Sequence, residues 1–130
     1  MHITYSYTKR INLPFHAAVT ATKNALTKEQ FGILSDIDIQ ATMKKKCDAN
    51  MDRYIILGAC HPQHALRALQ AEREIGLFLP CNVIVYEQNT AVFAAAILPT
   101  VAMHMIENPT LNDIAQQIER KLKRAIDNIA

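Results

Sequence analysis

The sequence predicts an α+β protein, a single domain over residues 1–130 in which helices pack on one face of a mostly antiparallel sheet. Short segments of alternating polar and apolar residues are mixed with segments of helical periodicity, and the two kinds do not alternate strictly along the chain. The strands predicted at residues 81–87 and 91–98 are separated only by residues 88–90, a length that suits an antiparallel hairpin. A chain of 130 residues is long enough for one ordinary core and too short for two.

The first predicted strand and helix lie before Gly32. Residues 2–8 alternate between polar and apolar side chains and therefore predict a strand. Asn12 is expected to cap the following helix, and Pro14 lies in its first turn, where a missing N–H costs least. Gly32 is expected to end this helix.

A second strand is predicted at residues 33–39, with Asp36 and Asp38 on its polar face. Two carboxylates at this spacing can serve acid–base chemistry when they are close and desolvated. The solvated side of an edge strand is nevertheless the preferred interpretation. A short helix containing Lys44–Lys46 is expected at residues 41–47, and a charge run of this kind usually forms a solvated face.

The middle of the chain predicts a buried strand followed by a helix. Residues 54–59 form a compact apolar run. Pro62 suits the first position of a helix that extends to about residue 71. The hairpin strands come next, and residues 99–107 fit both a helical turn and a packed loop.

The last helix has the clearest pattern. Thr110 followed by Asp113 resembles a capping box and is expected to mark its start. Its apolar residues then recur in steps of three and four, which predicts one buried stripe. They are Leu111, Ile114, Ile118, Leu122, Ala125, Ile126 and Ile129.

The composition excludes several classes of protein. Half of the residues are hydrophobic and 20% are charged, which excludes an intrinsically disordered chain. A net charge of +2 is too small for a dedicated nucleic-acid-binding protein, so no nucleic-acid partner is expected. The longest mostly apolar stretch, residues 90–98, is too short to span a membrane, and no signal peptide is recognisable. Three cysteines, an odd number, favour reduced thiols and a cytoplasmic location.

Cys60 is the first candidate for chemistry, because it lies between the strand at residues 54–59 and the helix that begins near Pro62. A helix N-terminus stabilises a thiolate, so the pKa of Cys60 is expected to be lowered. His61 is adjacent and His64 lies three residues on, and a protonated imidazole would lower the thiol pKa further. The preferred alternative is a small buried apolar residue at the end of a strand.

Cys81 is the second candidate, because it opens the first strand of the predicted hairpin. If this strand neighbours the one ending at Gly58, Cys81 could approach Cys60, and three outcomes are possible: a redox disulfide, a soft-metal site with His61 or His64, or simple packing. Packing is preferred, since the spacing of these residues matches no standard zinc pattern. No metal site and no particular cofactor are therefore predicted.

Two motifs in the chain are similar to those of a known family. They are Gly58-Ala59-Cys60-His61-Pro62 and Leu79-Pro80-Cys81-Asn82-Val83-Ile84-Val85-Tyr86-Glu87, and with them the chain resembles the DUF302 family of bacterial and archaeal proteins. The resemblance implies one compact α+β domain, similar to the sheets of TATA-box-binding proteins with packed helices, and a homodimer. It implies no established activity. The motif positions that match are Asp38, Lys46, Cys60, Pro62, Pro80, Cys81 and Glu87.

Three functions follow from these observations. The preferred one is a homodimeric scaffold that binds a small ligand or a soft metal near Cys60 and Cys81. The second is a thiol enzyme or redox protein with Cys60 as nucleophile, Cys81 as resolving partner, and Lys46 or His64 stabilising the thiolate. The third is a structural or interaction module without chemistry. For the preferred function the candidate ligand-binding residues are Asp38, Lys46, Cys60, His61, Cys81 and Glu87.

Overall fold

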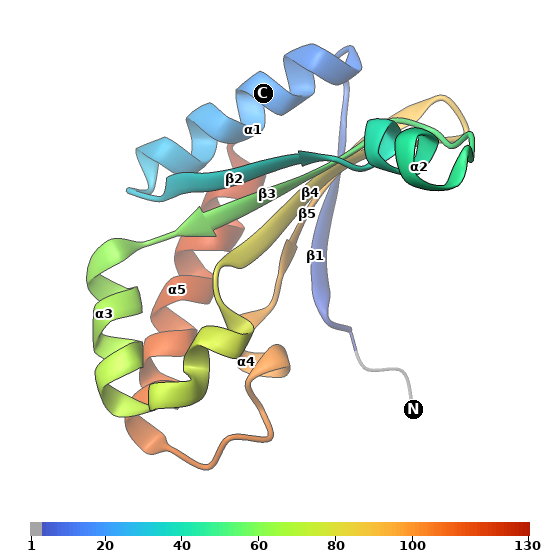
Figure 1. Cartoon of the computed structure of the whole chain (residues 1–130). Coiled ribbons are helices and arrows are strands. Elements are labelled where there is room, and N and C mark those ends of the chain that lie inside the picture. Colours follow the sequence, from blue (N-terminus) through green and yellow to red (C-terminus); the bar gives the residue numbers. More distant parts are fainter. Residues whose placement is uncertain (1–3) are drawn as a thin grey trace.

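The computed structural model describes residues 4–130 and is built on one five-stranded sheet in the order β1-β5-β4-β3-β2 (Figure 1). Every pair of neighbouring strands is antiparallel, which confirms the predicted α+β class. The strands are β1 (Ser6–Ile11), β2 (Gly32–Asp38), β3 (Tyr54–Cys60), β4 (Cys81–Gln88) and β5 (Ala91–Ile97).

The long helices lie on one side of this sheet (Figure 1). They are α1 (Phe15–Lys28), α3 (Pro62–Ala71) and α5 (Pro109–Asp127). Helix α2 (Ile39–Cys47) has no buried residue and lies at one end of the sheet, next to the β4–β5 hairpin. Two short elements complete the fold, the 3₁₀ helix η1 (Arg73–Phe78) and α4 (Pro99–Ala102).

The core lies between the sheet and the helices. The predicted apolar stripe of α5 is confirmed, because all of its seven residues are buried, including Ile129 beyond the end of the helix. Val83 and Val85 on β4 and Leu57 on β3 belong to the same core cluster and are fully buried. The periodicity of the sequence therefore located the α5 side of the core correctly.

Several predicted boundaries differ from the structure. Gly32 does not end α1, which already stops at Lys28, and instead begins β2. Strand β1 begins at Ser6 and extends to Ile11, and residues 1–3 lie outside the described part of the chain. Pro14 rather than Asn12 is the N-cap of α1, and no side chain caps this helix. Asn108 rather than Thr110 is the N-cap of α5, where its side chain accepts a hydrogen bond from the Leu111 N–H. An N-cap residue has extended backbone and directly precedes the first helical residue. In α5 the first helical residue is Pro109, so Asn108 is the N-cap and Thr110 already lies inside the helix.

The opposite side of the sheet, here called the open face, is apolar at its centre. Strand register places Ile37, Ile56, Ile84 and Ala95 side by side in one row across four strands. A second row consists of Tyr54, Tyr86 and Phe93, whose rings stack with centroids 5.7 and 5.4 Å apart. Within residues 4–130, no helix covers this face (Figure 1). The alternation of the strands also places Ser6, Thr8, Arg10, Ser35, Gly58, Asn82 and Ile97 on it.

Candidate functional site

The two cysteines of the motifs lie on the neighbouring strands β3 and β4, but they are not register partners. Cys81 pairs with Ala59 across the β3–β4 ladder, and both residues are buried on the helix side of the sheet. Cys60 follows Ala59 directly, and successive residues of a strand project from opposite faces. The two thiols are therefore separated by the sheet, and all three cysteines of the chain are free.

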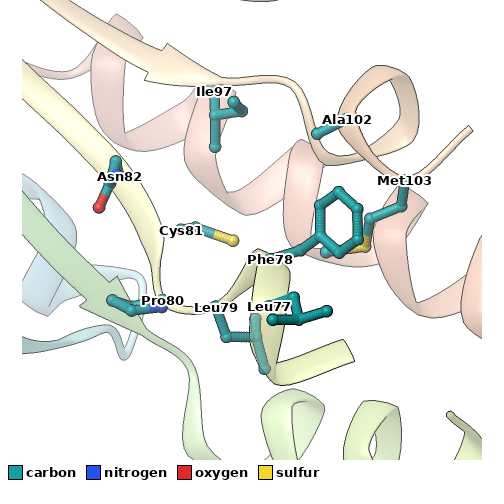
Figure 2. Close-up of a pocket in the computed structure, with 9 residues that line it drawn as sticks. All are labelled: Leu77, Phe78, Leu79, Pro80, Cys81, Asn82, Ile97, Ala102 and Met103. Carbon is teal, nitrogen blue, oxygen red and sulfur yellow. The ribbon is translucent and has the colours of Figure 1, made fainter. Parts of the chain in front are cut away.

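A cleft of about 250 Å³ lies beside Cys81, where β4 begins and β5 ends. The Cys81 side chain points toward Phe78 and Met103, and Ile97 lines the cleft from the end of the neighbouring strand β5 (Figure 2). The lining is mostly apolar, so the cleft suits a small uncharged molecule better than an ion. It is formed by Leu77, Phe78, Leu79, Pro80, Cys81, Asn82, Ile97, Ala102 and Met103.

Both thiols are protonated at neutral pH. Burial raises the pKa of Cys60, contrary to the expected lowering by the N-terminus of α3. The prediction was wrong because desolvation of the thiolate outweighs the helix dipole at this position. Burial, together with the nearby Cys60 charge, raises the pKa of Cys81 to about 12. A thiolate nucleophile is therefore disfavoured at both positions.

The two histidines beside Cys60 are neutral bases in contact with each other. His61 is the N-cap of α3, and its ring centroid lies 4.4 Å from that of His64. Burial is the main cause that lowers the pKa of each histidine. The imidazolium that was expected to stabilise a Cys60 thiolate is therefore absent near neutral pH.

The remaining predicted ligand residues lie at the opposite end of the sheet from Cys60. Asp38 pairs in register with Ile55, five residues before Cys60 on β3, which corresponds to about 17 Å along a strand. Its carboxylate caps α2 by accepting the Ala41 N–H at 2.9 Å. Glu87 lies in the same region, with its carboxylate 3.7 Å from the Arg53 guanidinium, and Lys46 is exposed in the last turn of α2. One pocket containing all six predicted ligand residues is thus excluded by the strand register.

Of the residues that form the cleft, Cys81 alone was predicted from the sequence to bind a ligand. Phe78 lies in the stretch that leads into the second motif, and Met103 lies in the segment that was ambiguous between a helix and a loop. Ile97 was expected in a strand, but nothing in its neighbourhood indicated a pocket. These residues come from separate segments that only the tertiary fold brings together, so no local pattern could have identified them.

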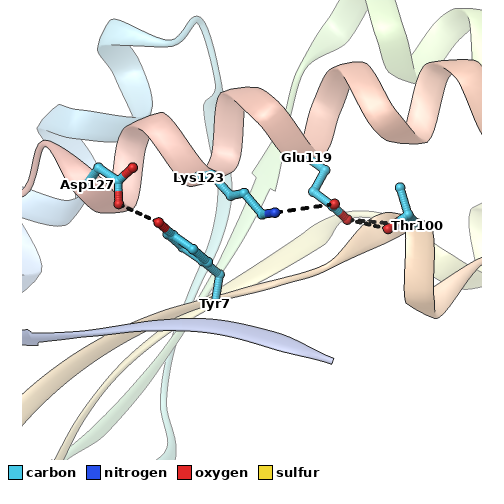
Figure 3. A network of polar contacts seen from close by, with 5 residues as sticks. All are labelled: Tyr7, Thr100, Glu119, Lys123 and Asp127. Atoms are coloured by element: carbon cyan, nitrogen blue, oxygen red, sulfur yellow. Dashed lines mark hydrogen bonds and ion pairs between the residues drawn. The ribbon is translucent and has the colours of Figure 1, made fainter. Parts of the chain in front are cut away.

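Helix α4, which forms one wall of the cleft, is attached to α5 by a polar network (Figure 3). Glu119 accepts hydrogen bonds from both the backbone N–H of Thr100 at 3.1 Å and its hydroxyl at 2.7 Å. Lys123 lies 3.7 Å from the same carboxylate, and the Tyr7 hydroxyl donates to Asp127 at 2.7 Å. The carboxylate of Glu119 thereby fixes the position of the cleft wall.

Among the described residues, no group of three or more His, Cys, Asp and Glu side chains could hold a metal ion. None of the helices in that part of the chain is long and apolar enough to cross a membrane.

Comparison with known proteins agrees with the two motifs. No significant match was found among curated proteins. The structure is similar to the crystal structure of an uncharacterised conserved DUF302 protein from Bacillus stearothermophilus, with a TM-score of 0.93 and 27% sequence identity. That similarity covers 98% of this chain and 100% of the other. A family model described as "Domain of unknown function DUF302" matches residues 7–129. Since this match spans nearly the whole sequence, the chain belongs to the DUF302 family.

Proposed function

We propose that this protein is a homodimeric binding protein that takes a small, largely apolar ligand in the cleft beside Cys81. The observation that supports this proposal is the cleft itself, about 250 Å³ in volume, into which Cys81, Phe78 and Met103 are directed (Figure 2). Drug-sized ligands occupy roughly 300–1,000 Å³. A ligand of about ten non-hydrogen atoms or fewer is therefore the expected occupant.

An uncharged ligand is favoured over a soft metal. Cys81 and Met103 both bring sulfur to the cleft, and sulfur ligands suit soft ions. A metal-bound cysteine must however lose its proton, and burial raises the pKa of Cys81 to about 12. The same property argues against the thiol-enzyme alternative, in which Cys81 resolves an intermediate formed at Cys60.

A cleft-filling substitution tests ligand binding. Indole and a panel of similarly sized neutral fragments are added to the wild type, to Ala102→Leu and to the matched control Ala17→Leu, an exposed position on α1. At about 100 times its Kd, a ligand stabilises the folded state by roughly 2.7 kcal/mol, which a thermal unfolding assay detects. We expect this shift in the wild type and the control but not in Ala102→Leu. Equal shifts in all three proteins, or none in the wild type, would contradict the proposal.

The open face supports the homodimer. Its centre is formed by aliphatic and aromatic residues, and of its residues only Arg10 is charged. A face with so little charge can pack against a second copy of itself without repulsion between like charges. Five strands of about seven residues cover roughly 550 Å² per partner, below the ~800 Å² of a standard interface. The expected dimer is therefore weak and dissociates on dilution.

The test of the dimer places a charge at the centre of the open face. Sedimentation equilibrium is compared for the wild type, Ile84→Lys and the control Leu66→Lys, whose side chain is 58% exposed on α3. Ile84→Lys is expected to be monomeric at concentrations where the other two dimerise, with circular dichroism confirming that all three are folded. A monomeric wild type would refute the dimer but would leave the ligand proposal intact.

The cytoplasmic location stays a prediction, supported by the three free thiols.

A further inference from the structure

A pair of imidazoles lies at the start of α3 and consists of the buried His61 and the half-buried His64. His61 is only 6% exposed, and its ring meets the ring of Phe31 edge-on at 5.4 Å and 81°. Its other side lies against His64, with 4.4 Å between centroids and 33° between planes. Among the described residues, both ring nitrogens of His61 and Nδ1 of His64 are buried and have no hydrogen-bond partner. Such a pair is tolerated only while it is uncharged, because burial of an unpaired charge is very costly.

The charges around the imidazole pair oppose its protonation. The positive charge of Lys121 on α5 lowers the pKa of both histidines, and the charge of Arg67 on α3 lowers that of His64. The N-terminus of α3 adds the positive end of a helix dipole. The same cations disfavour a metal ion bound between the two rings.

The other elements packed against the pair supply no compensating negative charge. Cys60 on β3 is a neutral thiol, since burial raises its pKa. The 3₁₀ helix η1 contains Arg73 and Glu74, but neither contributes to the lowered pKa of His61 or His64. Phe31, which precedes β2, is uncharged.

From this geometry we propose that the imidazole pair is a pH-sensitive device that holds the first turn of α3 against Phe31 only while both rings are uncharged. Acidification places a proton on one ring, and that charge faces a second imidazole, a lysine and a helix N-terminus. Moving the first turn outward lets water solvate the charge. The proposal does not depend on the ligand or on the dimer.

The direction of the pH dependence follows from the depressed pKa of each folded-state histidine. The unfolded chain titrates near the ordinary value of about 6.5 and binds more protons than the folded chain below that pH. The contribution of the pair to stability is therefore complete above about pH 6.5. It is lost progressively as the pH falls toward the lower folded-state pKa of each ring.

The test compares thermal unfolding of the full chain between about pH 7.5 and about pH 5. The proteins are the wild type, the double variant His61→Phe/His64→Phe, and the control His104→Phe at an exposed position. We expect Tm to fall with pH more steeply in the wild type and the control than in the double variant. Equal slopes in all three proteins would overturn the proposal.

One measurement on the wild type keeps the proposal falsifiable if the double variant does not fold. Titration of the imidazole resonances by NMR is expected to give midpoints below about 6.5 for His61 and His64, and midpoints at or above that value would overturn the proposal.

Discussion

Gly58 lies directly beneath Pro80, so that a Cβ atom at position 58 would come within 2.8 Å of the proline Cγ. It would also collide with the Ser35 hydroxyl on β2. Gly58 belongs to the first motif of the chain and Pro80 to the second, so the two motifs are in contact at this point. The contact explains why the first motif contains glycine at this position, independently of any chemistry at Cys60.

Gly58→Ala is accordingly expected to destabilise the protein. Overpacking of a tightly packed site costs roughly 1–3 kcal/mol, and here one of the colliding groups is a rigid proline ring. Gly76→Ala is the matched control, because a Cβ atom there meets nothing within 4 Å. Urea denaturation of the three proteins measures the difference. A loss of stability no larger in Gly58→Ala than in Gly76→Ala would show that Pro80 and Ser35 move aside freely.

The three cysteines are expected to react with iodoacetamide in an order set by burial. Cys47 is exposed, Cys60 is half-buried with a raised pKa, and burial raises the pKa of Cys81 to about 12. Peptide mapping of the native, reduced protein at about pH 8 should therefore find Cys47 labelled first and Cys81 unlabelled until the protein unfolds. Rapid labelling of Cys60 below about pH 7 would instead support the thiol-enzyme alternative.

Asn108→Ala is expected to cost roughly 1–2 kcal/mol, the usual effect of losing an N-cap. The Asn108 side chain accepts the Leu111 N–H and also donates to the Ala71 carbonyl at 2.9 Å, so it joins the start of α5 to the end of α3. Thr110→Ala is the control, since Thr110 makes no capping bond. Thermal unfolding of both variants distinguishes the two capping assignments. A larger loss in Thr110→Ala than in Asn108→Ala would contradict the structure.

Glu119→Ala is expected to destabilise the protein by about 1–3 kcal/mol, because it leaves the Thr100 N–H and hydroxyl without their acceptor. Glu107→Ala, at an exposed position in the loop before α5, is the control. Chemical denaturation gives the free energies of unfolding. In addition, NMR shifts of Ala102 and Met103 should change in Glu119→Ala only, since α4 forms a wall of the cleft. Unchanged shifts would mean that packing alone fixes this wall.

The spacing of apolar residues and the positions of prolines predicted most of the helices and strands. The apolar stripe of α5 could be predicted because each residue lies three or four positions from the next, and a helix brings such residues to one face. Pro62 was identified as the start of α3 for an equally local reason, the fixed backbone angle of proline. The caps of α1 and α5 were misplaced because the backbone conformation before the first turn, which no local pattern encodes, selects the N-cap. It selects Pro14 for α1, without a side-chain cap, and Asn108 rather than Thr110 for α5.

The candidate site depended on tertiary structure to a much greater degree. The sequence predicted a strand that ends just before Cys60 and another that begins at Cys81, but it left open whether the two strands are neighbours. Only the register decided that Ala59 is the partner of Cys81, because a shift of one residue reverses the face from which every side chain projects. Burial decided the protonation of the thiols and histidines, and at the histidines the charge of the distant Lys121 acts in the same direction. Local structure follows from neighbouring residues, whereas desolvation and the shape of a cleft are sums over the whole fold.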